Sequence, residues 1–240
     1  MGTSSARLAP TTRLWRLAKA AATRYLSPES GGAVDAREVA ASYVAALGEG
    51  GGPGPAGALA AFRQTRRAAQ NLGAFCCRAD SQGWPAALEA WGWQDLAGDG
   101  PEVLTPALSA ALEAPGGGLE QAVAHTALMG ILPNLSLASS QGERPARLVR
   151  LFLVEAFGLR LALDLGESLE AAAPGISSLR QGLTGLAAWI ERAAILPNLP
   201  PAPLTPEEWL GLPGWTWVSS LLTELILNLA GASPNILENN

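Results

Sequence analysis

The chain has 240 residues, of which 48% are hydrophobic, and its formal net charge at pH 7 is −5. This length and apolar content are enough to bury a sizeable core as one large domain or two small ones. The only two cysteines, Cys76 and Cys77, are adjacent, which excludes disulfides that join distant segments and favours a reduced, cytoplasmic protein.

Alanine, leucine, glycine and proline dominate the sequence, whereas β-branched and aromatic residues are sparse. This composition favours helices joined by Gly/Pro-rich loops over β-sheet. We therefore expect an all-α protein, an irregular multi-helix bundle with a flexible N-terminus. Three regions are expected: a flexible tail at 1–10, a basic helical region with a Gly/Pro-rich loop at 11–57, and a helical core domain at 58–240.

The first residues, MGTSS, place a glycine directly behind the initiator methionine. Removal of Met1 leaves an unhindered α-amine on Gly2. N-myristoylation requires Ser or Thr at position 6, where this chain has Ala6. From the residues alone, the simplest interpretation is a solvated terminus.

Two helices are predicted in the basic region. Thr12 can cap the first, whose apolar residues form one stripe: Leu14, Leu17, Ala18, Ala21 and Tyr25. Asp35 and Glu38 form a capping-box-like start of the second, which Gly48 ends. The following GEGGGPGPAG formally contains a dinucleotide-binding G-x-G-x-x-G pattern. Its prolines lack the amide hydrogens that a pyrophosphate needs, so we interpret it as a connector.

An amphipathic helix is predicted over residues 59–78. Its polar side comprises Arg63, Arg66, Arg67 and Gln70. The three arginines are a candidate contact for phosphate groups or for a partner protein, and a solvated face is the competing interpretation. Residues 1–78 contain ten basic residues against four acidic ones, a net charge of +6. Such asymmetry is compatible with nucleic-acid binding and equally with a complementary protein surface.

The remaining sequence predicts helices over 85–91, 99–114, 118–132, 144–170, about 179–190 and 217–230, and another that begins at Thr205. Thr205-Pro206-Glu207-Glu208 supplies a capping threonine, a first-turn proline and a third-position glutamate. Gly158 and Gly166 are candidate breaks in the long central helix. The most apolar stretch, residues 148–166, carries four charges, so we expect a buried helix and no membrane span.

No catalytic pattern stands out in the sequence. His125 is the only histidine, and no Cys, Asp or Glu lies at metal-ligand spacing from it. Nucleotide-binding, hydrolase and redox motifs are also missing, so we predict a binding or structural protein that uses no metal or cofactor. Four of the eight tryptophans are candidate interface anchors: Trp91, Trp93, Trp215 and Trp217.

The order of several short patterns resembles the QatB family, a component of the bacterial Qat anti-phage defence system. The most specific are MGTS at the N-terminus and TRRAAQNLG at 65–73. Between and after them come AREVAASYVAALGEGG at 36–51, LEAWGWQDLAGDGPEVLTPALSAAL at 88–112 and GGGLEQAVAHTAL at 116–128. The similarity covers most of the chain, although its C-terminal third is generic.

The resemblance implies a cytoplasmic, non-catalytic subunit that acts beside an ATPase (QatA), a TatD-like nuclease (QatD) and a protein similar to queuosine-pathway QueC enzymes (QatC). QueC enzymes use ATP to activate a carboxylated deazaguanine, and a relative could join such a base to a protein amine. We therefore expect Gly2 to be the modified residue, with Thr3, Ser4 and Ser5 threading into the enzyme's cleft. Two alternatives stay open: a pure scaffold for the ATPase, and a helical protein that binds nucleic acid through its basic N-terminal half.

Overall fold

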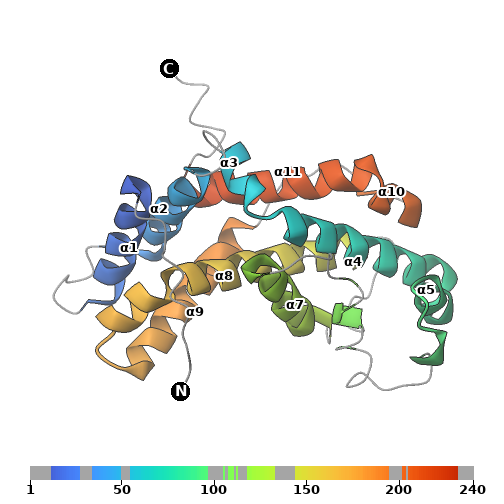
Figure 1. Cartoon of the computed structure of the whole chain (residues 1–240), viewed down its shortest axis with the longest axis horizontal. Helices are drawn as coiled ribbons and strands as arrows, with labels where there is room; N and C mark the ends of the chain where they lie inside the picture. The colour runs from blue at the N-terminus through green and yellow to red at the C-terminus, as the bar shows by residue number, and fades with distance from the viewer. Residues whose placement is uncertain are drawn as a thin grey trace. The chain divides into compact units, whose positions relative to one another are not determined.

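The computed structural model describes residues 12–27, 34–49, 55–96, 105, 108–110, 112, 118–132, 144–194, 202–203 and 205–231. These residues form helices and no strand, which confirms the predicted all-α, multi-helix fold (Figure 1). Contacts divide the chain into two compact units. Unit 1 comprises 1–60, 160–193 and 226–240, and unit 2 comprises 61–159 and 194–225.

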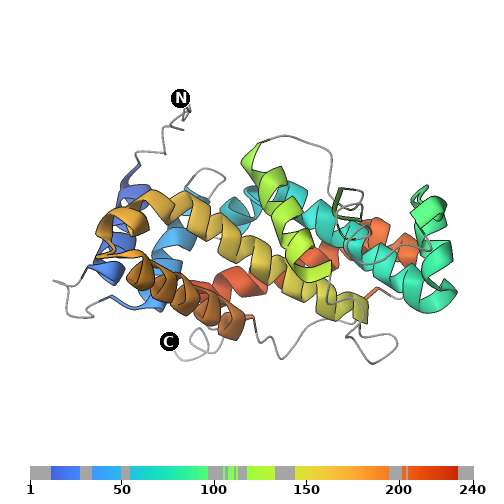
Figure 2. The ribbon, with the colours of Figure 1, turned by 90° about the horizontal axis from the view of Figure 1, so that it is seen from below.

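Unit 1 contains α1 (Arg13–Leu26), α2 (Ala36–Gly48), α3 (Pro55–Ala60), α9 (Ile176–Ala193), and parts of α8 (Arg144–Ala172) and α11 (Leu212–Leu229). Helices α1 and α2 lie side by side, and α9 contacts both (Figure 2). The predicted start of α2 is confirmed, because the Asp35 side chain accepts a hydrogen bond of 2.9 Å from the Glu38 N–H. Thr12 does not cap α1 with its side chain; its hydroxyl donates to the carboxylate of Glu49.

The predicted apolar stripe of α1 needs one correction. Ala18 and Ala21 are fully buried as expected, and Ala22 joins them. Leu17, however, is 49% exposed and belongs to the outward face. The buried side of α1 is therefore built mainly of small alanine side chains, and these allow close helix packing without Leu17.

A buried polar cluster in unit 1 joins α2 to α8. The Tyr43 hydroxyl donates to Asp164 Oδ2 at 2.8 Å, and Arg160 Nε donates to the same oxygen at 2.8 Å. Tyr43 is fully buried and meets Trp15 edge to face, with ring centroids 5.9 Å apart. Burial raises the pKa of Tyr43 well above its ordinary value of 10.0, and the negative charge of Asp164 raises it further. This cluster therefore requires a neutral tyrosine.

We predict that the fold loses stability in alkali because of this tyrosine. Since folding raises the pKa of Tyr43, its contribution to the free energy of unfolding is complete below pH 10 and decreases as the pH rises above that value. Tyr25, the only other tyrosine, also has a raised pKa, mainly through burial. Absorbance of tyrosinate during a pH titration should show both groups ionising above the ordinary range. In the Tyr43→Phe variant, the titration should retain only the Tyr25 step; ionisation of Tyr43 at its ordinary pKa would contradict the prediction.

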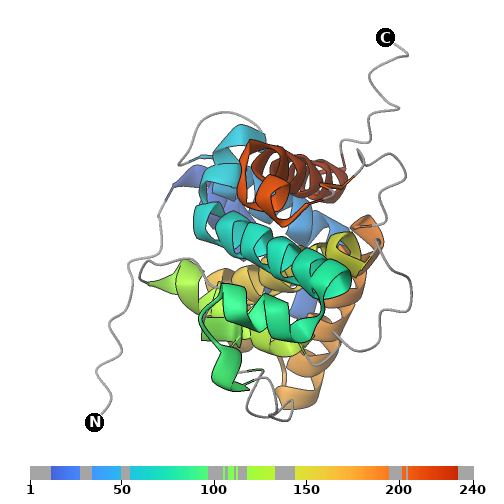
Figure 3. The same ribbon diagram turned by 90° about the vertical axis from the view of Figure 1, so that its right-hand side faces the viewer.

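Unit 2 is organised around α4 (Arg63–Gln82), which contacts α5 (Trp84–Ala90), α7 (Leu119–Ile131) and α10 (Pro206–Leu210). Helices α10 and α5 lie on different sides of α4 (Figure 3). The short 3₁₀ helix η2 (Gln94–Leu96) follows α5, and parts of α8 and α11 complete the unit. Its largest fully buried side chains include Leu72, Phe75, Leu128, Phe152 and Trp209.

Several predicted helix boundaries change. Helix α8 runs unbroken through Gly158 and Gly166 for 29 residues. Phe157, Leu161 and Leu165 beside these glycines are buried, and this packing offsets the low helix propensity of glycine. The helix predicted from residue 59 is interrupted after Ala60, and α4 begins only at Arg63. At the interruption, Phe62 is buried and stacks on Phe157 with ring centroids 5.5 Å apart. Most of the predicted helix 99–114 lies outside the described residues.

The predicted single core domain at 58–240 also differs from the contact grouping. Its first residue lies close to the point where unit 1 gives way to unit 2, between Ala60 and Ala61. Residues 160–193, however, group with the N-terminal region in unit 1. Sequence order could not show this, because α8 and α11 each supply residues to both units. No helix in the described ranges has the length and apolarity needed to cross a membrane.

Candidate functional site

The predicted modification segment, Gly2 to Ser5, lies outside the described residues. The structure does describe the other predicted contact residues, all of which belong to unit 2. They are Arg63, Arg66, Arg67, Trp91, Trp93, Trp215 and Trp217. The local geometry separates those that are presented to solvent from those that hold the fold.

Of the three arginines, Arg66 is built into the contact between α4 and α11. Its guanidinium lies 4.2 Å from the centroid of the Trp215 ring, and its Nη1 donates to Ser219 Oγ at 3.0 Å. Burial lowers the pKa of Arg66; the charge of Glu120 acts in the opposite direction, and that of Arg63 adds to the lowering. This cation–π contact anchors Trp215 and stabilises the pairing of the two helices.

Arg63 and Arg67 are exposed, so they remain candidates for contact with a partner. Arg67 is oriented by Gln70, since its Nη1 donates to Gln70 Oε1 at 3.1 Å. Their neighbour Arg66 is half-buried. The guanidinium groups of Arg63 and Arg67 are therefore more accessible to a partner than that of Arg66. The basic patch is therefore smaller than the sequence suggests.

Gln70 was predicted on the polar side of its helix but is fully buried. Its Nε2 donates to the carbonyl oxygens of Trp209, at 2.9 Å, and Gly211, at 3.0 Å. These carbonyls lie at the C-terminal end of α10, where a short helix leaves acceptors without partners of its own. The physical reason is that a buried side-chain amide can donate hydrogen bonds to the free carbonyl groups at a helix end. Helical periodicity classifies glutamine only as polar, so it predicts an exposed position.

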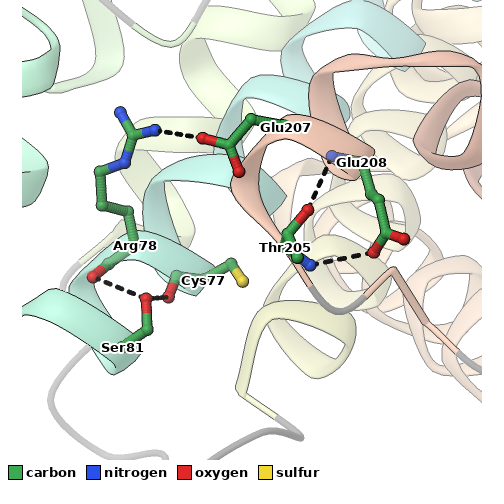
Figure 4. Close-up of polar contacts among 6 residues, drawn as sticks. All are labelled: Cys77, Arg78, Ser81, Thr205, Glu207 and Glu208. Carbon is green, nitrogen blue, oxygen red and sulfur yellow. Dashed lines mark hydrogen bonds and ion pairs between the residues drawn. The ribbon is translucent and has the colours of Figure 1, made fainter.

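Helix α10 is also fastened by local and long-range polar contacts (Figure 4). The Thr205 hydroxyl accepts from the Glu208 N–H at 3.1 Å, and the Glu208 carboxylate accepts from the Thr205 N–H at 3.1 Å. This confirms the predicted capping box. Arg78 of α4 adds an ion pair of 2.8 Å to Glu207. The two hydrogen bonds from Gln70 and the ion pair from Arg78 hold this five-residue helix on α4, and the two hydrogen bonds of the capping box stabilise its first turn.

The start of α4 is capped by a residue from another helix, which the sequence did not reveal. Phe62 at the N-cap has no capping side chain. Instead, Glu120 of α7 accepts hydrogen bonds from the N–H groups of Gln64 and Thr65, the latter at 3.0 Å. Thr65 is 1% exposed, so water cannot easily replace this acceptor. Glu120 thus satisfies buried donors at the helix N-terminus and places its negative charge at the positive end of the helix dipole.

Replacing Glu120 by alanine should lower the free energy of unfolding by about 1–2 kcal/mol, because two N–H groups of α4 lose their acceptor. Glu120→Gln keeps an acceptor oxygen and should lose about half as much. Chemical denaturation of both variants measures these changes. Glu89→Ala, on the exposed surface of α5, is the control and should stay within about 0.5 kcal/mol of the original protein. Equal stability of Glu120→Ala and the control would contradict the capping function.

The tryptophans fall into two groups. Trp217 is 4% exposed and meets Trp209 edge to face, with ring centroids 5.2 Å apart, which corrects its prediction as an interface anchor. Trp91 and Trp93 are partly buried against the core of unit 2, and Trp215 is partly buried beneath Arg66. Interface functions for these three stay predictions. The central aromatic residue is Trp209, which sequence analysis missed although it directly follows the capping box.

His125, Cys76 and Cys77 lie partly or fully buried among residues that pack the fold. His125 is partly buried, and its Nδ1 lies 3.1 Å from the Oγ of Ser109, which is itself fully buried. Burial raises the pKa of Cys76 and Cys77, and the charge of Asp80 adds to this in both, so neither thiol is activated as a nucleophile. In the part of the chain that the structure describes, no group of three His, Cys, Asp or Glu side chains is arranged to hold a metal ion.

Comparison with models of known protein families, with curated proteins and with solved structures finds no match to this chain.

Proposed function

We propose that this protein is a non-catalytic subunit of a bacterial anti-phage defence system, as its resemblance to the QatB family implies. In this proposal the helical body is a scaffold, and the N-terminus is a substrate. A QueC-like partner enzyme (QatC-like) modifies Gly2 after removal of Met1. The proposed assembly also includes an ATPase (QatA) and a TatD-like nuclease (QatD).

The observation that carries the proposal is the glycine amine directly behind Met1, in front of the family-like series of patterns. An α-amine has an ordinary pKa of about 7.7–8.0, so roughly a third of it is neutral near pH 7.5. A lysine amine, with an ordinary pKa of about 10.4, is neutral in only about one molecule in a thousand at that pH. Because glycine has no side chain, the α-amine of Gly2 is also less crowded than that of any other residue. It is therefore the better nucleophile for an activated carboxylate.

The proposed step forms one amide bond. The partner uses ATP to activate the carboxylate of a deazaguanine, the neutral Gly2 nitrogen attacks the activated carbonyl carbon, and the activating group leaves. The amine loses one proton as the amide forms. Thr3, Ser4 and Ser5 carry small side chains, which suit an extended peptide that enters an enzyme's cleft.

Intact-mass analysis after co-expression with the QueC-like partner tests this proposal. We expect one added mass per chain, located by peptide mapping at Gly2. Lys19→Arg is a matched control because Lys19 is the only lysine: removing its side-chain amine should leave the added mass unchanged. Gly2→Leu, which retains Met1, should abolish modification. An unmodified Gly2 beside a demonstrably active partner would refute the proposal.

The scaffold alternative makes a different prediction for the same variant. If the protein only docks the ATPase, Gly2→Leu should leave phage defence intact in cells. If modification of Gly2 is required, the variant should lose defence although the folded body is unchanged. Plaque assays on cells that carry the complete system distinguish the two.

A further inference from the structure

The outward face of α1 is the first described surface that follows the N-terminal tail. Four exposed residues form this face, which we call the α1 face: Arg13, Arg16, Leu17 and Ala20. Their spacing of three, four and seven residues puts them on one side of a helix. Ala18, Ala21 and Ala22, on the other side, are fully buried. The α1 face therefore points away from the packing of unit 1.

The α1 face combines positive charge with an apolar centre. Leu17, 49% exposed, is bordered along the helix by Arg13 and Arg16. Among the described residues no ion pair neutralises these two guanidinium groups, whereas Arg24, farther along α1, is paired with Glu38 at 3.1 Å. An exposed leucine bordered by two exposed arginines fits a protein surface that offers carboxylates around an apolar recess.

The length of the tail limits which partner can reach the α1 face. Ten residue steps separate Gly2 from Thr12, and a fully extended chain spans at most about 3.6 Å per residue. An enzyme that holds Gly2 in its active site is therefore within about 36 Å of the start of α1. A contact between that enzyme and α1 becomes effectively intramolecular, which increases occupancy of the tail in the active site.

We propose that Arg13, Arg16 and Leu17 form a docking surface for the enzyme that modifies Gly2, and that this surface contacts an acidic area of the enzyme. The inference rests on the proposed function for the identity of the enzyme. It adds a second recognition element, separate from the tail. The tail presents the amine, and the α1 face binds the enzyme.

The test is the double charge reversal Arg13→Glu/Arg16→Glu, compared with Arg147→Glu/Arg180→Glu, which makes the same charge change at exposed positions of α8 and α9. Glutamate in the first turns of a helix suits the helix dipole, so α1 should remain folded; circular dichroism checks this. With ATP, kcat/KM for modification of Gly2 should fall at least about tenfold in the α1 variant, through KM and with kcat retained. The control pair should stay within about twofold of the original protein.

Binding of the two proteins without ATP separates docking from chemistry. We expect the original protein to bind, the α1 variant to bind at least about tenfold more weakly, and the difference to shrink at high salt. Equal binding and modification of the original protein and the α1 variant would overturn the docking surface alone. If the original protein binds through the α1 face but is never modified, the docking surface stands and the proposed function fails. If the original protein neither binds the enzyme nor is modified, the docking surface and the proposed function are both overturned. If the α1 variant loses affinity only for a DNA oligonucleotide, the docking surface is overturned.

Discussion

Replacing Gly73 by alanine should lower the free energy of unfolding by about 3 kcal/mol, although alanine is the better helix former. Gly73 lies in the middle of α4, where intrinsic propensity alone would favour alanine by about 1 kcal/mol. A Cβ at this position would lie 2.2 Å from Cε3 of Trp209. Because Trp209 is fully buried and packed against Trp217, its ring has no free space to enter. The steric cost should therefore exceed the propensity gain.

Gly166→Ala is the matched control for this prediction. Gly166 also lies inside a helix, α8, but an added Cβ there has no neighbour within 4 Å. This substitution should stabilise the protein by about 0.5–1 kcal/mol, and thermal or chemical denaturation measures both changes. Opposite signs at the two glycines would support the packing argument. A stabilised Gly73→Ala protein would show that Trp209 does not occupy the position described.

The second large effect is expected at Asp164. Asp164→Ala should lower the free energy of unfolding by about 3 kcal/mol, because it removes the shared acceptor of Tyr43 and Arg160. The side chains of Arg160 and Asp164 are only 18% and 14% exposed, so water replaces the lost partner poorly. The guanidinium of Arg160 and the hydroxyl of Tyr43 would then remain buried without this carboxylate.

Two further variants test this explanation by denaturation. Glu167→Gln removes a charge from an exposed position on the same helix and should change stability by less than about 0.5 kcal/mol. Adding Arg160→Met to Asp164→Ala should recover part of the loss, because the buried guanidinium that lost the carboxylate of Asp164 is no longer present. The free energy of unfolding lost in the double variant is compared with the sum of the losses in Asp164→Ala and Arg160→Met. Equal values would show that Arg160 and Asp164 are not energetically coupled.

Local motifs were predicted well from the sequence. The capping box at Thr205 and the cap at Asp35 were confirmed because each involves residues only three positions apart. Apolar periodicity also located α7 and α9 to within a few residues. The candidacy of Gly2 stays a prediction, because it depends only on the position behind Met1 and on the neighbouring residues.

Long-range contacts decided what local patterns could not. Leu17 follows the apolar spacing of α1 yet is exposed, and Gln70 follows the polar spacing of α4 yet is buried beneath the end of α10. Glu120 caps a helix that begins 57 residues before it in the chain. None of these assignments has a signal in neighbouring residues.

The sequence by itself determined that the chain is helical and where most of the described helices begin. Only the tertiary structure decided which side of α1 faces outward and which arginine of α4 is held by Trp215. The reason is physical: helix propensity and local caps such as those at Asp35 and Thr205 act between residues a few positions apart. Burial depends on which distant side chain fills the same space.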